Sequence, residues 1–131
     1  LQVIASHLDD VERDLPGVMS ASRVIAVAGT ATTMAAVEIG LIDYDPAQID
    51  GFVLERAAAE DVFRTLATEP FDDRIHNPGL QRERADVIVA GAAIMVGIMR
   101  FLGLDEVIVS ERDILDGLAD SLVSPSGPLG A

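Results

Sequence analysis

The segment 23–40 constrains the fold most, because an apolar run meets a glycine and a cluster of threonines there. Residues 24–28 are apolar and rich in β-branched side chains, which predicts a buried strand. Gly29 ends that strand, and hydroxyls crowd the start of a helix predicted over about 32–39, from Thr30, Thr32 and Thr33. Such a junction directs unpaired backbone N–H groups at one small volume, at the positive end of the helix dipole. The segment therefore suits a phosphate oxygen.

The same junction also has a plain structural interpretation. Thr30 or Thr32 acting as an N-cap, with Gly29 in a tight turn, explains the pattern without any ligand. The segment contains neither the Gly-Lys-Ser/Thr of a Walker loop nor the G-x-G-x-x-G of a dinucleotide-binding fold. On this segment alone both hypotheses stay open.

Length and composition limit the fold and the chemistry. The chain has 131 residues, enough for one domain with a real core. Half of the residues are hydrophobic, but with 4 Phe, 1 Tyr and no Trp the core must consist mostly of small aliphatic side chains. The absence of cysteine excludes disulfides, thiolate metal sites and cysteine nucleophiles, and favours a cytoplasmic protein.

Charge and hydropathy restrict the partners. Nine basic and 22 acidic residues give a net charge of −13, which disfavours nucleic acid and anionic membranes. A phosphate site here must rely on local backbone donors or on cations from elsewhere. The longest uncharged apolar run, 87–99, is shorter than the roughly 20 residues of a membrane span. The N-terminus has no signal-peptide pattern and no Met, and we expect the chain to begin partway through a longer protein.

Hydrophobic periodicity predicts an α/β chain with few strands for its number of helices. We expect one folded unit over 1–123 and a flexible tail over 124–131 that is rich in Ser, Pro and Gly. Helices are predicted over 3–15, 32–39, 55–67, 81–102 and 111–122, and strands over 24–28, 49–54 and 106–110. The last helix is expected to face the core with Ile114, Leu115, Leu118 and Leu122.

A second cluster lies where the predicted helix 81–102 begins. Arg82 and Arg84 stand in its first turns, where the helix dipole favours acidic side chains. Compensation by Glu83 and Asp86 makes this a surface ion-pair cluster, whereas compensation by a bound anion makes it a site. The two interpretations are evenly balanced.

A third cluster, Ser110-Glu111, follows the strand 106–110. If this strand neighbours 24–28, both strand ends and Gly29-Thr30 share one rim, where ligands bind in open α/β sheets. Ser110 alone is more simply a helix cap, paired with Asp113 in a capping box. His7 and His76 lack ligand spacing, so no metal site is assigned, and the acidic doublets are typical of a solvated surface.

Four motifs occur in order within the folded unit 1–123: Ala28-Gly29-Thr30-Ala31-Thr32-Thr33, Tyr44-Asp45-Pro46, Pro78-Gly79-Leu80 with Arg84-Ala85-Asp86, and Val109-Ser110-Glu111 with Asp116-Gly117-Leu118. With these motifs the chain resembles the exopolyphosphatase and guanosine pentaphosphate phosphatase family (Ppx/GppA), and in particular its actinobacterial members. The resemblance implies part of the second lobe of an actin-like, ribonuclease-H-type phosphatase.

Members of that family release terminal phosphate from polyphosphate or guanosine pentaphosphate with the help of Mg²⁺. The resemblance implies phosphate-binding roles for Gly29, Thr30 and Thr32. It also implies a lining of the site by Arg84, Asp86, Ser110 and Glu111.

The chain also departs from the family pattern. The lobe with the catalytic carboxylate and both Asp-x-Gly-type phosphate loops are missing, and Asp116 stands where the family usually has Arg. We therefore expect a C-terminal fragment that carries no catalytic residue, is inactive alone and self-associates through an exposed sheet edge. The alternatives are a non-catalytic phosphate-binding or regulatory module, and a lobe of another actin-like phosphotransferase.

Overall fold

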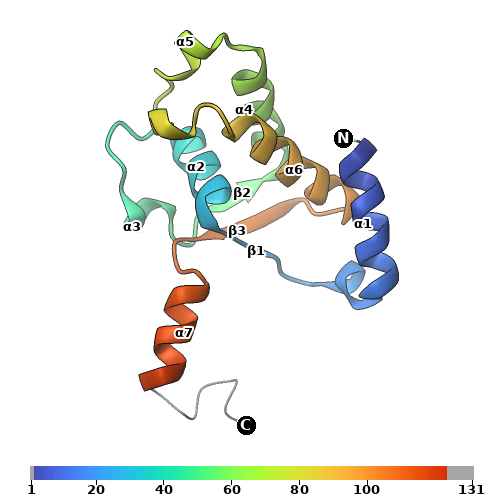
Figure 1. Ribbon diagram of the computed structural model, residues 1–131. Helices are drawn as coiled ribbons and strands as arrows, with labels where there is room; N and C mark the ends of the chain where they lie inside the picture. The colour runs from blue at the N-terminus through green and yellow to red at the C-terminus, as the bar shows by residue number, and fades with distance from the viewer. Residues whose placement is uncertain (1, 124–131) are drawn as a thin grey trace.

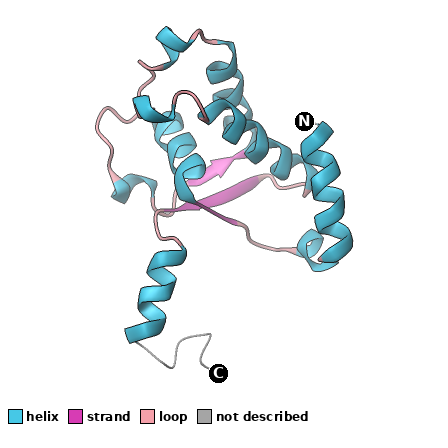
Figure 2. Ribbon diagram, viewed as in Figure 1, coloured by secondary structure: helices cyan, strands magenta, loops and turns pink. Residues whose placement is uncertain are grey.

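A three-stranded sheet organises residues 2–123, which are the residues that the computed structural model describes (Figures 1 and 2). Strand β1 (Ile25–Val27) pairs in parallel with β3 (Glu106–Ser110), and β2 (Val53–Glu55) pairs antiparallel with the other edge of β3. The predicted tail, 124–131, lies outside the described residues.

Helices cover one side of this sheet (Figure 1). Helix α2 (Ala28–Ile39) packs on β3 and contacts both α4 (Arg56–Thr68) and α6 (Ile88–Phe101), while α1 (Gln2–Asp14) lies along α6. The remaining elements are the 3₁₀ turns η1 (Pro16–Ser20) and η2 (Arg82–Arg84) and the helices α3 (Pro46–Ile49), α5 (Phe71–Arg74) and α7 (Ile114–Val123). No helix among the described residues has the length and apolarity to span a membrane.

Small side chains let the helices approach one another closely. On α2, Ala31, Ala35 and Ala36 are completely buried, and on α6 Ala92 is buried as well. A Cβ atom on Gly91 would lie 2.5 Å from the Thr30 hydroxyl oxygen, so only glycine permits this contact between α6 and α2. The scarcity of aromatic residues is thus a requirement of close helix packing.

The sequence predicted the α/β class, α1, α4 and the exact bounds of β3. Differences arise where turn chemistry competes with periodicity. Helix α2 begins at Ala28, four residues earlier than predicted, because the strand ends at Val27. The predicted helix 81–102 is interrupted, with only a 3₁₀ turn at 82–84 before α6. Asp45 caps the unpredicted helix α3 by accepting a hydrogen bond from the Ala47 N–H at 3.0 Å.

The prediction that α7 faces the core is wrong. Its apolar side chains are exposed, Ile114 at 83%, Leu118 at 57% and Leu122 at 77%, and none of its residues is buried. Helix α7 leaves the sheet on the side opposite α2, α4 and α6 (Figure 1). Periodicity correctly showed an amphipathic helix, but it carries no information on which surface covers the apolar stripe.

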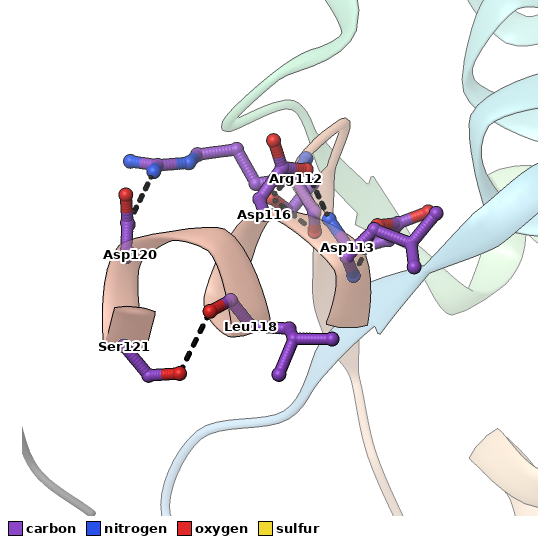
Figure 3. A network of polar contacts seen from close by, with 8 residues as sticks. Arg112, Asp113, Asp116, Leu118, Asp120 and Ser121 are labelled. Carbon is purple, nitrogen blue, oxygen red and sulfur yellow. Dashed lines mark hydrogen bonds and ion pairs between the residues drawn. The ribbon is translucent and has the colours of Figure 1, made fainter. Parts of the chain in front are cut away.

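Local interactions support α7 in place of core packing (Figure 3). Asp113 accepts a hydrogen bond from the Leu115 N–H at 2.8 Å, and Asp116 accepts one from the Asp113 N–H at 2.9 Å, which together form a capping box. Arg112 forms an ion pair with Asp120 at 2.8 Å across two turns. The helix cap predicted at Ser110 is therefore at Asp113.

The backbone at the strand–helix junction predicts a stabilising substitution. Ala28 has φ 70°, the left-handed conformation that costs a non-glycine residue about 1–3 kcal/mol. We expect Ala28→Gly to raise the free energy of unfolding by roughly 1 kcal/mol, measured by urea denaturation. The matched control, Ala90→Gly on the exposed face of α6, should lower it by about 1 kcal/mol. Destabilisation by both changes would contradict the strained conformation.

Candidate functional site

The ends of β1 and β3 bring two of the predicted clusters together. The parallel register pairs Val27 with Ser110, so the residues that follow each strand emerge at the same edge of the sheet. The prediction that Gly29-Thr30 and Ser110-Glu111 share one rim is confirmed.

The N-terminus of α2 has no side-chain cap. The N-cap residue is Val27, and no acidic residue lies in the first turn. The Thr32 hydroxyl lies 3.4 Å from the carbonyl oxygens of Ala28 and Gly29, inside the helix. The interpretation of Thr30 or Thr32 as the N-cap is therefore wrong. The backbone N–H groups of the first turn receive no side-chain acceptor among residues 2–123, which leaves them and the helix dipole available to an anion.

The Arg84 guanidinium lies directly against Gly29. A Cβ atom at Gly29 would lie 1.9 Å from Nη1 of Arg84, so glycine is what admits the guanidinium to this position. Arg84 Nε donates a hydrogen bond to the Gln81 side-chain oxygen at 3.0 Å. Within the described part of the chain, no ion pair involves Arg82, Glu83, Arg84 or Asp86, and the interpretation as a surface ion-pair cluster is wrong. A cation thus lies beside a helix N-terminus that already favours anions.

The partly buried side chain of Arg74 holds the loop that carries Arg84 in place. The guanidinium of Arg74 donates to the carbonyl oxygens of Leu66 at 2.7 Å, Glu69 at 2.9 Å and Ala85 at 3.1 Å. It therefore satisfies carbonyls at the end of α4 and ties them to the residue that follows Arg84. The sequence reasoning missed this role, although an arginine beyond a helix C-terminus was the available signal.

Tyr44 links the two sides of the rim. Its hydroxyl donates a hydrogen bond to the Glu111 carboxylate. Burial raises the pKa of Tyr44 above 10.0, as do the hydrogen bond and the charge of Glu111, while the Thr32 hydroxyl and the Arg84 charge act in the opposite direction. The Tyr44 hydroxyl thus lies among groups from three separate segments, and this residue was missed as a site residue.

Asp50 fixes the end of β3. One of its carboxylate oxygens accepts hydrogen bonds from the Ser110 hydroxyl and from the Glu111 N–H, each at 3.0 Å. The Ser110 hydroxyl also accepts from the Arg112 N–H at 3.1 Å. Ser110 is thereby an anchor of the rim. Asp50 could not be identified from local sequence patterns, because the two partners lie 60 residues apart.

Not every predicted residue joins the cluster. Asp86 is exposed, and no hydrogen bond or ion pair connects it to the rim within residues 2–123. In the same range, no three His, Asp or Glu side chains lie together as a metal-ligand set. A cavity of about 400 Å³ lies beside the site, with Tyr44 and Gln81 in its wall. The rim therefore combines helix N–H groups, one arginine and one tyrosine–glutamate pair.

Comparison with known proteins gives consistent results. The model of the Ppx/GppA phosphatase family matches residues 4–125. Exopolyphosphatase 2 of Mycobacterium tuberculosis is 35% identical over 102 residues, which are 75% of this chain and 32% of that protein. The Aquifex aeolicus Ppx/GppA family member aligns with a TM-score of 0.78 and 25% identity, over 96% of this chain and 41% of that one. An exopolyphosphatase-like protein aligns with a TM-score of 0.83 and 26% identity, over 89% and 38%.

The Tyr44–Glu111 pair predicts a measurable titration. Tyr44 is the single tyrosine in a chain without tryptophan, so phenolate absorbance reports its pKa directly. We expect Glu111→Gln to lower that pKa towards 10.0 without abolishing the shift, because burial still contributes. Glu106→Gln, at the other end of β3, should leave the pKa unchanged. An unaltered pKa in Glu111→Gln would contradict the pairing.

The raised pKa of Tyr44 also determines how this residue affects stability at alkaline pH. Its pKa is higher in the folded state than in the unfolded state, so its contribution is fully present below pH 10.0 and is lost as the pH rises through the folded-state pKa. Glu111→Gln should therefore reduce the loss of stability above pH 10.0.

Proposed function

Because the chain belongs to the Ppx/GppA phosphatase family, we propose that it forms one side of the phosphate site in an exopolyphosphatase-like phosphohydrolase. The reaction is the release of a terminal phosphate to water, from inorganic polyphosphate or from guanosine pentaphosphate.

One observation carries the proposal, namely the uncapped N-terminus of α2 with the Arg84 guanidinium seated on Gly29. Backbone N–H groups at a helix N-terminus and a planar guanidinium both suit phosphate oxygens as hydrogen-bond donors. Their combination offsets, over a few ångströms, the repulsion expected from a net charge of −13. The site thus provides locally the positive potential that the acidic chain as a whole lacks.

Each rim residue has a proposed part in holding the phosphate. Gly29 and Thr30 offer backbone N–H groups, and Arg84 offers its guanidinium N–H groups. Thr32 is buried beside Tyr44, so its hydroxyl supports the rim from within. The hydrogen bond from Tyr44 holds the Glu111 carboxylate at a defined place on the rim, instead of leaving it free to occupy the anion position.

The remaining catalytic groups are proposed to come from outside this chain. The chain spans about a third of the length of the curated relative and two fifths of the solved ones. The residues described do not supply a metal-ligand set, so Mg²⁺ does not fit here without further ligands. The carboxylate that activates water is likewise assigned to the rest of the longer protein, which we place in the actin-like class and in the cytoplasm.

The absence of a ligand set among the described residues also supports a second candidate, a non-catalytic phosphate-binding module. Both candidates share the anion site and differ in whether the longer protein hydrolyses its ligand. The third candidate is a lobe of another actin-like phosphotransferase. It would require the longer protein to bind a nucleotide.

Anion binding by the chain itself tests the site. Tripolyphosphate titrated into the labelled chain should shift the backbone amide signals of Gly29 and Thr30. We expect Arg84→Gln to weaken binding by about tenfold or more, because a charge-assisted hydrogen bond contributes roughly 1.5–3 kcal/mol. The control is Arg82→Gln, an exposed arginine two residues away, which should have little effect. Equal losses in both variants would indicate nonspecific charge attraction.

Gly29→Ala separates binding from folding. The new Cβ meets the far end of a flexible side chain, so Arg84 moves away at little cost in stability, and alanine favours the helix. We expect the free energy of unfolding to stay equal or to rise by up to about 1 kcal/mol while tripolyphosphate affinity falls. A fall in both would instead mark Gly29 as a structural residue.

Activity distinguishes the candidates. The isolated chain should release no phosphate from polyphosphate in the presence of Mg²⁺, and measurable release would contradict the assignment of catalytic groups elsewhere. In the longer protein, Arg84→Gln should lower kcat/KM by about tenfold or more and leave Tm nearly unchanged, because the guanidinium is the proposed phosphate ligand. A longer protein that binds polyphosphate without hydrolysing it would favour the binding module.

A further inference from the structure

The segment that carries Arg84 interrupts a helix that its sequence favours. Residues 81–90 contain neither glycine nor proline, and the Gln, Arg, Glu and Ala residues among them are strong helix formers. The structure nevertheless has a 3₁₀ turn at η2, and α6 begins only at Ile88. Since sharp breaks in helices arise mostly at proline or glycine, this one needs a cause from elsewhere in the fold.

The backbone hydrogen bonds show where the winding of the chain changes. The N–H groups of Arg84, Ala85 and Val87 each donate to the carbonyl oxygen three residues earlier, at 2.9–3.2 Å. From Gly91, whose N–H donates to the Val87 oxygen at 3.1 Å, the spacing is the four residues of an α-helix. The segment before α6 is therefore wound as a 3₁₀ helix, and the Ala85 dihedral angles, φ −59° and ψ −28°, agree with that form.

This change of winding aims the Arg84 side chain. A 3₁₀ helix turns by about 120° per residue and an α-helix by about 100°, so from residue 88 back to residue 84 the side-chain directions differ by about 80°. An α-helix that extended through Arg84 would therefore turn the guanidinium away from Gly29, against which it lies in the structure.

Arg74 occupies the carbonyl oxygen that such an extension would need. Its Nη1 donates a hydrogen bond of 3.1 Å to the Ala85 oxygen, which a continuous α-helix would pair with the Val89 N–H. No backbone N–H among residues 2–123 donates to that oxygen. Ala85 is completely buried, so its carbonyl group needs a partner, and Arg74 supplies one from outside the helix.

The other donors of Arg74 fix its guanidinium to the C-terminal end of α4. Nε donates to the Leu66 oxygen at 2.7 Å, and Nη2 donates to the Glu69 oxygen at 2.9 Å. Three nitrogen atoms of one planar group thus bond to three carbonyl groups, which the single nitrogen of a lysine cannot reproduce. Because α4 also packs on α6, it gives Arg74 a fixed base from which to hold Ala85.

We propose that Arg74 is a positioning residue of the anion site: by bonding the Ala85 carbonyl it prevents α6 from extending through 84–87, and it thereby aims the Arg84 guanidinium at the N-terminus of α2. Without this bond, the Ala85 oxygen finds its replacement partner in the Val89 N–H, and α6 gains a turn while Arg84 leaves Gly29. This inference rests on the proposed phosphate site and adds to it a residue that touches no ligand.

Arg74→Lys tests this role without a change in net charge. The ammonium group cannot bond all three carbonyls, so we expect the affinity for tripolyphosphate to fall by about threefold to tenfold, the effect of one lost hydrogen bond. Because the charge is kept, weaker general attraction does not explain such a fall. The matched control is Arg64→Lys, at an arginine of α4 whose side chain is 69% exposed, and it should leave the affinity unchanged.

A double variant shows whether Arg74 acts through Arg84. In a chain that already carries Arg84→Gln, the further change Arg74→Lys should leave tripolyphosphate affinity as it is, because the group that Arg74 positions is gone. Losses that add up in the double variant would overturn the proposal.

Amide hydrogen exchange separates positioning from a general loss of structure. In Arg74→Lys, the Val89 N–H gains the Ala85 oxygen, so its exchange should slow several-fold, and the Cα chemical shifts of 84–87 should move towards α-helical values. A general loosening would instead accelerate exchange at Val89 and along α6. Unchanged or faster exchange at Val89 would overturn the proposal.

The unchanged chain gives a second measurement, which remains informative where Arg74→Lys does not fold. Its Val89 amide should exchange rapidly, whereas the Gly91 amide, two residues further on, should be protected. Protection of Val89 in the unchanged chain would overturn the proposal. Absence of tripolyphosphate binding by the unchanged chain overturns the proposed function, whereas equal affinity in the unchanged chain and in Arg74→Lys overturns only the role of Arg74.

Discussion

The close approach of α6 to the first turn of α2 is the constraint on which the candidate site depends. Gly91 allows it, because any larger residue there would collide with the Thr30 side chain. The approach fixes where α2 starts relative to the segment that precedes α6, which carries Arg84. Gly29 then leaves the guanidinium room to rest on the helix N-terminus. Two glycines on different elements therefore set the position of a cation beside helix N–H groups.

Local sequence patterns predicted the parts of the site that depend on local structure. The β-branched runs gave β1 and β3, and because both end at the same edge of a parallel pair, Gly29 and Ser110 could be placed on one rim. Tyr44 and Asp50 could not be found in this way. Their partners are 67 and 60 residues distant, and only the tertiary fold brings a loop and a short helix to the end of β3.

The errors have physical causes of the same kind. Threonines at a helix start are common caps, but here the backbone turns at Ala28 so that Thr32 lies one turn inside the helix and its hydroxyl reaches backward. An amphipathic stripe on α7 indicated a buried face, and the fold of the described residues leaves that face uncovered. Periodicity identifies a surface that needs a partner and does not identify the partner.

The hydrogen bonds of Asp50 connect the rim to the start of the segment that leads into α7. The same carboxylate that holds Glu111 at the rim also fixes the direction in which α7 leaves the sheet. A change in the position of α7 would therefore pull on Glu111, and through its hydrogen bond on Tyr44, which lies beside Thr32 and Arg84. The short segment 110–113 therefore has defined contacts to the candidate site on one side and continues into α7 on the other, which is the arrangement that coupling between two places requires.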